Sequence, residues 1–167
     1  KPRPPNLLAL ASAPARQTPA PQDVAQAPRS LKGSVCGDPA IQGEVLAPIL
    51  SRVKGCGVPE AVSVTSIDGV RFSQPAIIDC TTAKAFKTWI KKGMRPAFGN
   101  RKVVGLHIFG SYMCRSRNNV RGARISEHGR GKAIDVAGFQ FSDGTEWTVL
   151  NDYNKQIRKA HKAACGI

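Results

Sequence analysis

Five cysteines spread along the chain constrain its fold more than any other feature of the sequence. No two of them form the C-x-x-C pair that is typical of structural zinc sites and thioredoxin-like motifs. Dispersed cysteines in a small basic chain favour disulfides and an oxidising compartment, although buried free thiols in a cytosolic protein would fit the same pattern. The odd count leaves at least one cysteine unpaired, and the spacing leaves the pairing open. The cysteines are Cys36, Cys56, Cys80, Cys114 and Cys165.

The first 34 residues differ in composition from the rest of the chain. They are rich in Pro, Ala and Gln and show no sustained hydrophobic period, which is typical of a semi-extended linker or tail. We therefore expect one domain over residues 35–167, long enough for a hydrophobic core. No apolar run approaches the roughly 18 residues that span a bilayer, and no signal peptide precedes the tail, so an exported protein would be in its mature form.

The chain carries a net charge of +14, and the positive charge is concentrated in one stretch. Residues 84–132 contain thirteen Lys or Arg and one acid, Glu127. This predicts a basic face and an anionic partner: nucleic acid, an acidic membrane surface or an anionic wall polymer. Nucleic acid is the least favoured of the three, because the basic residues are not interleaved with the aromatic side chains on which bases stack.

Helical and extended patterns alternate along residues 35–167. Asp38-Pro39 is typical of a helix start, and apolar residues then recur at helical spacing as far as Val53, with a kink at Pro48. The alternation in residues 61–67 and 70–72 predicts a strand hairpin. A second helix is expected from a cap at Thr81 or Thr82 to Gly93.

The remaining elements complete a predicted α+β fold. Residues 103–109 form a buried strand, residues 115–132 a long loop, and residues 133–137 a short strand. A hairpin turning at Asp143-Gly144 and a last helix capped by Asn151 or Asp152 follow. These elements predict a small, mostly antiparallel sheet flanked by helices.

The segment SEHGRGKAID, residues 126–135, carries a candidate metal pair. A helix would separate His128 and Asp135 by about 10 Å. Gly129 and Gly131 instead permit a tight reversal, after which the strand entering at Ala133 brings Asp135 back beside the imidazole. The common alternative for such a pair is a loop histidine and a hydrogen-bonded strand acid.

Residues 126–135 fit the pattern S-x-H-x-x-G-x-A-x-D, which resembles the first metal motif of the zinc peptidases that include D-alanyl-D-alanine peptidases, lysostaphin-type enzymes and the hedgehog fold. More widely, residues 36–167 resemble the extensin-like C-terminal domain family of bacteria. The segments that carry this resemblance are CGDPAI at Cys36, GSYMCR at Gly110, the SEH motif and the AACG near the end.

The resemblance implies a hedgehog or D-Ala-D-Ala peptidase-like fold and a secreted or periplasmic enzyme of the cell envelope that acts on peptidoglycan. It implies Zn2+ held by His128 and Asp135, with bound water activated for peptide hydrolysis. Arg115 would orient substrate as a catalytic residue, and Ser126 and Tyr112 would contact it. The alternative for Arg115 is one arginine among several in a basic loop.

Catalytic zinc needs three protein ligands and an open position, but only two are evident. Relatives continue into an H-x-H motif that supplies the third ligand, whereas this chain ends at Ile167. We expect His107 to be a core or sheet-face residue and His161 to lie on the polar flank of the last helix. The domain is therefore expected to be a zinc endopeptidase or carboxypeptidase that is C-terminally incomplete, and its activity in this form is left open. The alternative is a non-catalytic binding module for anionic cell-wall polymer.

Overall fold

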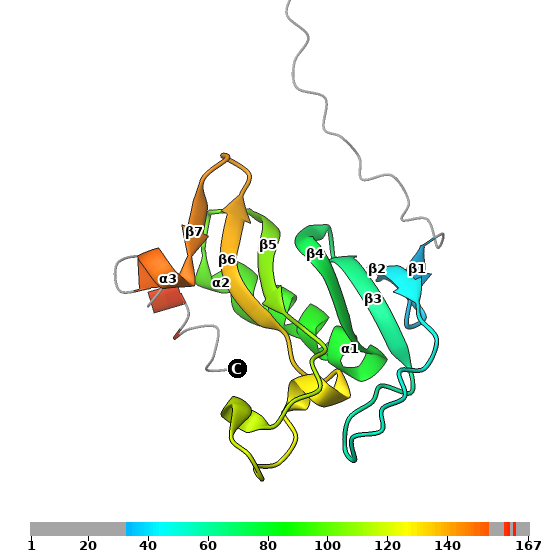
Figure 1. Cartoon of the computed structure of the whole chain (residues 1–167). Coiled ribbons are helices and arrows are strands. Elements are labelled where there is room, and N and C mark those ends of the chain that lie inside the picture. The colour runs from blue at the N-terminus through cyan, green and yellow to red at the C-terminus, as the bar shows by residue number, and fades with distance from the viewer. Residues whose placement is uncertain (1–32, 154–158, 161, 163–167) are drawn as a thin grey trace, which may run out of the picture.

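The computed structural model describes residues 33–153, 159–160 and 162. This part of the chain folds around a seven-stranded sheet whose strands lie side by side in the order of the sequence (Figure 1). The strands are β1 (Ser34–Val35), β2 (Asp38–Val45), β3 (Ala61–Ile67), β4 (Val70–Asp79), β5 (Val103–Gly110), β6 (Asp135–Phe141) and β7 (Glu146–Thr148).

The sheet is mixed, because β4 and β5 run parallel while every other neighbouring pair of described strands is antiparallel. A parallel pair needs a crossover connection. Here the crossover is one helical segment, formed by α1 (Cys80–Trp89), the π-turn η1 (Ile90–Met94) and α2 (Arg95–Ala97), which packs against the sheet (Figure 1). The predicted α+β fold, a sheet flanked by helices, is therefore wrong: the described domain is dominated by its sheet.

The predicted helix over residues 38–53 is the main source of this error. Residues 38–45 form β2 instead, paired with both β1 and β3. The Asp38 carboxylate accepts the N–H of Ala40 in a local turn, so it does not cap a helix. Ile41 is buried as expected, but Val45, four residues on, is 76% exposed, and the register of β2 against β3 shifts between the two residues.

Several other strand predictions are confirmed. Residues 61–67 are β3, and its hairpin with β4 turns at Asp68 and Gly69, both of which have positive φ. β5 covers the predicted buried strand, and β6 and β7 form the hairpin around Asp143-Gly144. Of the predicted last helix, the structure describes α3 (Val149–Asp152) and a few later residues; His161 and Cys165 lie outside the described residues.

The crossover helix starts earlier and ends later than the sequence predicts. The Asp79 carboxylate, rather than Thr81 or Thr82, caps it by accepting the Thr82 N–H at 2.6 Å. The helical segment continues past Gly93, which is buried against the sheet with Ile90 and Met94. Burial of these apolar residues, together with Ala83, outweighs the weak helix propensity of glycine.

Two disulfides form among the described residues, which confirms the prediction of disulfides. Cys36 pairs with Cys80 and ties the β1–β2 turn to the start of α1, and Cys56 pairs with Cys114. Such bonds are typical of proteins from oxidising compartments. No helix in the described part of the chain is both long and apolar enough to cross a membrane.

Two carboxylates of the sheet bind cations of the crossover helix. The buried Asp68 pairs with Arg95, and Asp38 pairs with Lys87. The hydrogen bond from Lys87, reinforced by the Ala40 N–H, lowers the pKa of Asp38 below its ordinary value of 3.8. A carboxyl group whose pKa is lowered by folding stabilises the fold above its unfolded pKa, and that contribution is lost as the pH falls through the folded value.

We therefore expect Lys87→Met to reduce the free energy of unfolding by about 1 kcal/mol at neutral pH. The same substitution should raise the pKa of Asp38 toward 3.8. Chemical denaturation across acidic pH and NMR titration of the carboxyl carbons test both effects. Lys84→Met, on the exposed side of the same helix, is the control and should change neither quantity. An Asp38 pKa that does not respond to Lys87→Met would contradict the assignment.

Candidate functional site

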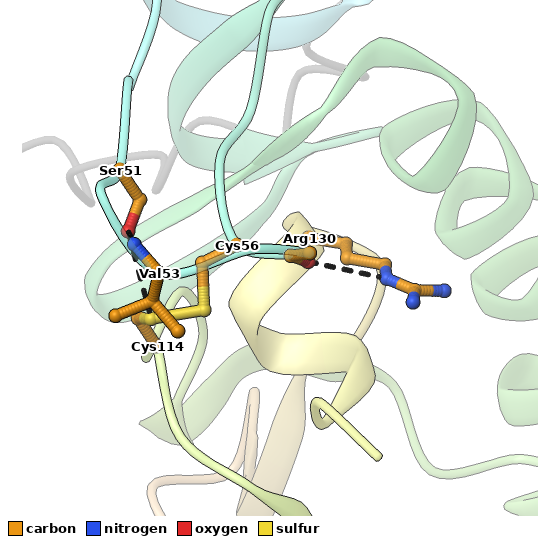
Figure 2. Close-up of a disulfide and its surroundings, with 6 residues drawn as sticks. Ser51, Val53, Cys56, Cys114 and Arg130 are labelled. Atoms are coloured by element: carbon orange, nitrogen blue, oxygen red, sulfur yellow. Dashed lines mark hydrogen bonds between the residues drawn. A yellow bond between two sulfur atoms is a disulfide. The ribbon is translucent and has the colours of Figure 1, made fainter.

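Two long loops meet at one end of the sheet, although they lie far apart in the sequence (Figure 1). One connects β2 to β3 through residues 46–60, and the other connects β5 to β6 through residues 111–134. The Cys56–Cys114 disulfide joins them, and the Gly57 N–H donates to the Gly129 carbonyl at 2.8 Å. Figure 2 shows the disulfide and the Arg130 Nε, which donates to the Gly55 carbonyl at 3.3 Å. We call residues 46–60 and 111–134 together the linked loops.

Two glycines permit this close approach. A Cβ atom on Gly129 would lie 2.8 Å from Ile125 Cγ2 and 3.1 Å from the Cys56 sulfur, so a side chain there would push the loops apart. Gly131 has φ of 68°, the left-handed conformation that glycine adopts at low cost. It ends the short 3-10 helix η3 (Glu127–Arg130) and reverses the chain toward β6.

The reversal brings His128 and Asp135 together, as the glycine spacing predicts. Nε2 of His128 lies 3.3 Å from Oδ2 of Asp135. The imidazole is almost buried, whereas half of the Asp135 side chain is exposed. Nδ1 of the same ring lies 2.6 Å from the backbone carbonyl oxygen of Ser111. The ring is thus held on both sides, by one loop backbone and by the first residue of β6.

These two contacts determine what the imidazole can do. A carbonyl oxygen only accepts hydrogen bonds, so Nδ1 of His128 must carry a proton. Nε2 then faces the Asp135 carboxylate, and a doubly protonated ring donates to both neighbours. We call this pair, which links the 111–134 loop to β6, the clamp.

The zinc cofactor predicted from the resemblance is not supported by the donors present. Catalytic zinc is held by three protein ligands. Among residues 33–153, 159–160 and 162, no group of three or more His, Cys, Asp or Glu side chains is placed to hold a metal ion. His128 and Asp135 thus lack a third ligand in this part of the chain. His107 does not supply one, since its Nε2 lies 3.3 Å from Glu146 at the β5–β7 side of the sheet.

A cleft of about 380 Å³ opens in front of the clamp. Arg115, His128 and Asp135 line it, and the exposed side chains of Phe109 and Met113 form apolar parts of its wall. The structure therefore brings three of the predicted site residues to one cleft. Their proposed contact with a substrate stays a prediction.

The other two predicted site residues lie differently. Ser126 is 7% exposed, and its backbone N–H donates to the Arg115 carbonyl, so it supports the loop from inside. Tyr112 is half-buried and is not among the residues that line the cleft. Its backbone N–H donates to the carbonyl oxygen of Ile77. Direct contact of either side chain with a ligand stays a prediction.

A second cavity, of about 640 Å³, lies between the linked loops. Lys54, Arg117, Arg124 and Arg130 line it together with Glu127. The charge of residues 84–132 indicated a basic face, but Lys54 lies outside that stretch. The Cys56–Cys114 disulfide, whose pairing the sequence leaves open, joins the loop that carries Lys54 to the loop that carries the arginines.

The comparisons with known proteins point to one family. A family model described as "Extensin-like protein C-terminus" matches residues 39–167, which confirms this part of the resemblance. No curated protein and no solved structure shows significant similarity to the chain. The more distant relation to zinc peptidases and the hedgehog fold stays a prediction.

We expect the neutral ring of His128 to be the tautomer with its proton on Nδ1, because that nitrogen contacts a carbonyl oxygen. Long-range ¹H–¹⁵N NMR of the imidazole rings tests this. Asp135→Asn is the matched control, since it removes the carboxylate at Nε2 and leaves the Ser111 contact in place. A neutral ring with its proton on Nε2 alone would contradict the clamp.

Proposed function

The chain belongs to the extensin-like protein C-terminus family, and from this premise we propose that it is a non-catalytic binding module for an anionic cell-wall polymer, with peptidoglycan as its partner. The charge of the linked loops carries the proposal. They contain eight Lys or Arg residues and two acids, Glu60 and Glu127. The cationic residues are Arg52, Lys54, Arg115, Arg117, Arg121, Arg124, Arg130 and Lys132.

The disulfide turns two basic segments into one surface. Lys54 comes from one loop and Arg117, Arg124 and Arg130 from the other, yet all line the same cavity. Like charges held this close attract a polyanion more strongly than the same charges on separate segments, and salt screens the attraction. An extended anionic polymer suits such a surface, because it meets several cations at once.

The cleft beside this surface supports binding rather than hydrolysis. Nδ1 of His128 contacts the Ser111 carbonyl, Nε2 lies 3.3 Å from Oδ2 of Asp135, and the described residues place no third metal ligand beside them. Arg115 lines the cleft, and its planar guanidinium suits a carboxylate such as that of a peptidoglycan stem peptide. In this proposal Arg115 is a binding residue, and the clamp shapes the wall of the cleft.

The disulfides support a place for this module in the bacterial envelope, either periplasmic or secreted. Cys56–Cys114 joins the basic surface, and Cys36–Cys80 joins the crossover helix to the sheet. Both bonds persist where thiols are oxidised. Peptidoglycan is an anionic polymer of that compartment.

Cosedimentation with purified peptidoglycan sacculi tests the proposal. The triple variant Arg52→Glu, Arg121→Glu, Lys132→Glu should weaken binding by at least about tenfold, given roughly 1 kcal/mol for each cation near an anionic surface. Binding by the unsubstituted protein should also fall as salt is raised.

The matched control reverses three exposed lysines outside the linked loops, at Lys84, Lys92 and Lys102, with the same change in net charge. If both triple variants weakened sacculus binding equally, the effect would depend on net charge alone, and this would contradict a specific binding surface on the linked loops. Release of soluble muropeptides from the sacculi would contradict the non-catalytic part. Tighter binding to duplex DNA than to sacculi would identify nucleic acid as the partner instead.

A further inference from the structure

We propose that the cavity lined by Lys54, Arg117, Arg124 and Arg130 is a binding site for a phosphoryl group, and we call it the cationic cavity. The inference deepens the proposed function and rests on it only for the source of the group, a phosphate-bearing wall polymer. The cleft at Arg115 and His128 is a different cavity, with different lining residues.

The protein's own carboxylate shows that the cationic cavity accepts an oxyanion. Oε1 of Glu127 lies 3.2 Å from Nη2 of Arg117 and 3.9 Å from Nη1 of Arg130. Both distances exceed the roughly 2.7–2.9 Å of a full charge-assisted hydrogen bond, so the two guanidinium groups are only partly satisfied. Their remaining N–H donors are available to a ligand that enters the cavity.

The charges in the cavity are not balanced. Four cationic side chains face one carboxylate, which leaves three positive charges unneutralised. Within the described part of the chain, neither Lys54 nor Arg124 forms an ion pair. A single carboxylate ligand would leave most of this charge in place, whereas successive phosphodiester groups of one polymer each bring a negative charge and two free acceptor oxygens.

The backbone holds the cations in position. The Arg117 N–H donates to the Arg124 carbonyl at 2.9 Å, and Ser116 and Ile125 form an isolated β-bridge beside them. Nε of Arg130 is anchored on the Gly55 carbonyl, next to Lys54, which leaves its two terminal nitrogens for an anion (Figure 2). A site organised in this way before binding loses less conformational entropy when the ligand arrives.

The chemistry of the walls favours a phosphorylated wall polymer over single-stranded nucleic acid. Three of the four cations are arginines, whose planar donors match phosphate oxygens in pairs. The side chains that complete the lining are Ala123, Ile125 and Glu127, and none of them is aromatic. Single-stranded nucleic acids are held by aromatic side chains that stack on bases, and this cavity lacks them.

Titration of the 167-residue chain with inorganic phosphate, followed by ¹H–¹⁵N NMR and calorimetry, tests the site. The double variant Lys54→Gln, Arg124→Gln should raise the phosphate Kd by at least about tenfold, because it removes two charge-assisted contacts. Glu127→Gln should shift it the opposite way and lower the Kd by about threefold or more, because it removes the competing carboxylate.

Each variant has a matched control. Lys84→Gln, Lys92→Gln changes the charge equally on the exposed side of the crossover helix, and Glu60→Gln removes the other acid of the linked loops, which lines a different cavity. Acetate should bind more weakly than phosphate. The proposed site would be overturned if the control variants changed the phosphate Kd as much as the test variants do. It would also be overturned if acetate bound as tightly as phosphate.

Three further probes identify the source of the phosphoryl group: a soluble poly(glycerol phosphate), vesicles containing phosphatidylglycerol, and duplex DNA. The inference expects the first to bind most tightly and to respond to the same variants. Preference for vesicles or DNA would overturn the assignment to a wall polymer. Sacculus binding without a variant-sensitive phosphate site would defeat this inference and leave the proposed function standing. A variant-sensitive phosphate site without sacculus binding would defeat the proposed function and leave the phosphate site standing.

Discussion

The Cys56–Cys114 disulfide is the bond on which the proposed binding surface depends. The two cysteines are 58 residues apart, and each sits in a loop rather than in a strand of the sheet. Eight cationic residues in these loops repel one another, and a covalent bond holds the two loops together against this repulsion. In the chain-entropy model, closing a loop of this length stabilises the fold by about 4 kcal/mol. The Gly57–Gly129 backbone bond then fixes the register between the loops.

The local sequence around His128 and Asp135 would suit either a metal site or a side-chain pair that links a loop to the sheet. Gly131 reverses the chain, β6 presents Asp135, and the Ser111 carbonyl orients the imidazole. A hydrogen bond from Nδ1 to a backbone carbonyl oxygen, such as that of Ser111, would also orient a histidine that binds a metal. What distinguishes the two cases is the third donor, and the described residues place none beside this pair. Asp135 and the Ser111 carbonyl thus hold the imidazole at the rim of the cleft.

Structural features that depend on neighbouring residues could be predicted from the sequence. Features that depend on contacts between distant segments could not. The reversal at His128 follows from neighbouring glycines, and the β6–β7 hairpin from Asp143-Gly144, so both were predictable. Residues 38–45 form a strand because β1 and β3 pair with them, a tertiary effect that their apolar spacing does not reveal. Lys54 joins the cationic cavity through a disulfide whose partner the spacing left open. The third zinc ligand was expected by analogy alone, and no side chain in the described residues supplies it.

The most direct test of this account is sacculus binding by the double variant Cys56→Ala, Cys114→Ala, measured together with amide hydrogen exchange. Cys36→Ala, Cys80→Ala is the control, since it removes the disulfide that lies outside the linked loops. We predict that the first variant alone loses most of its wall binding, with faster exchange confined to residues 46–60 and 111–134 and protection retained in β3 to β5. Unchanged wall binding in that variant, with the loops demonstrably loosened, would contradict it.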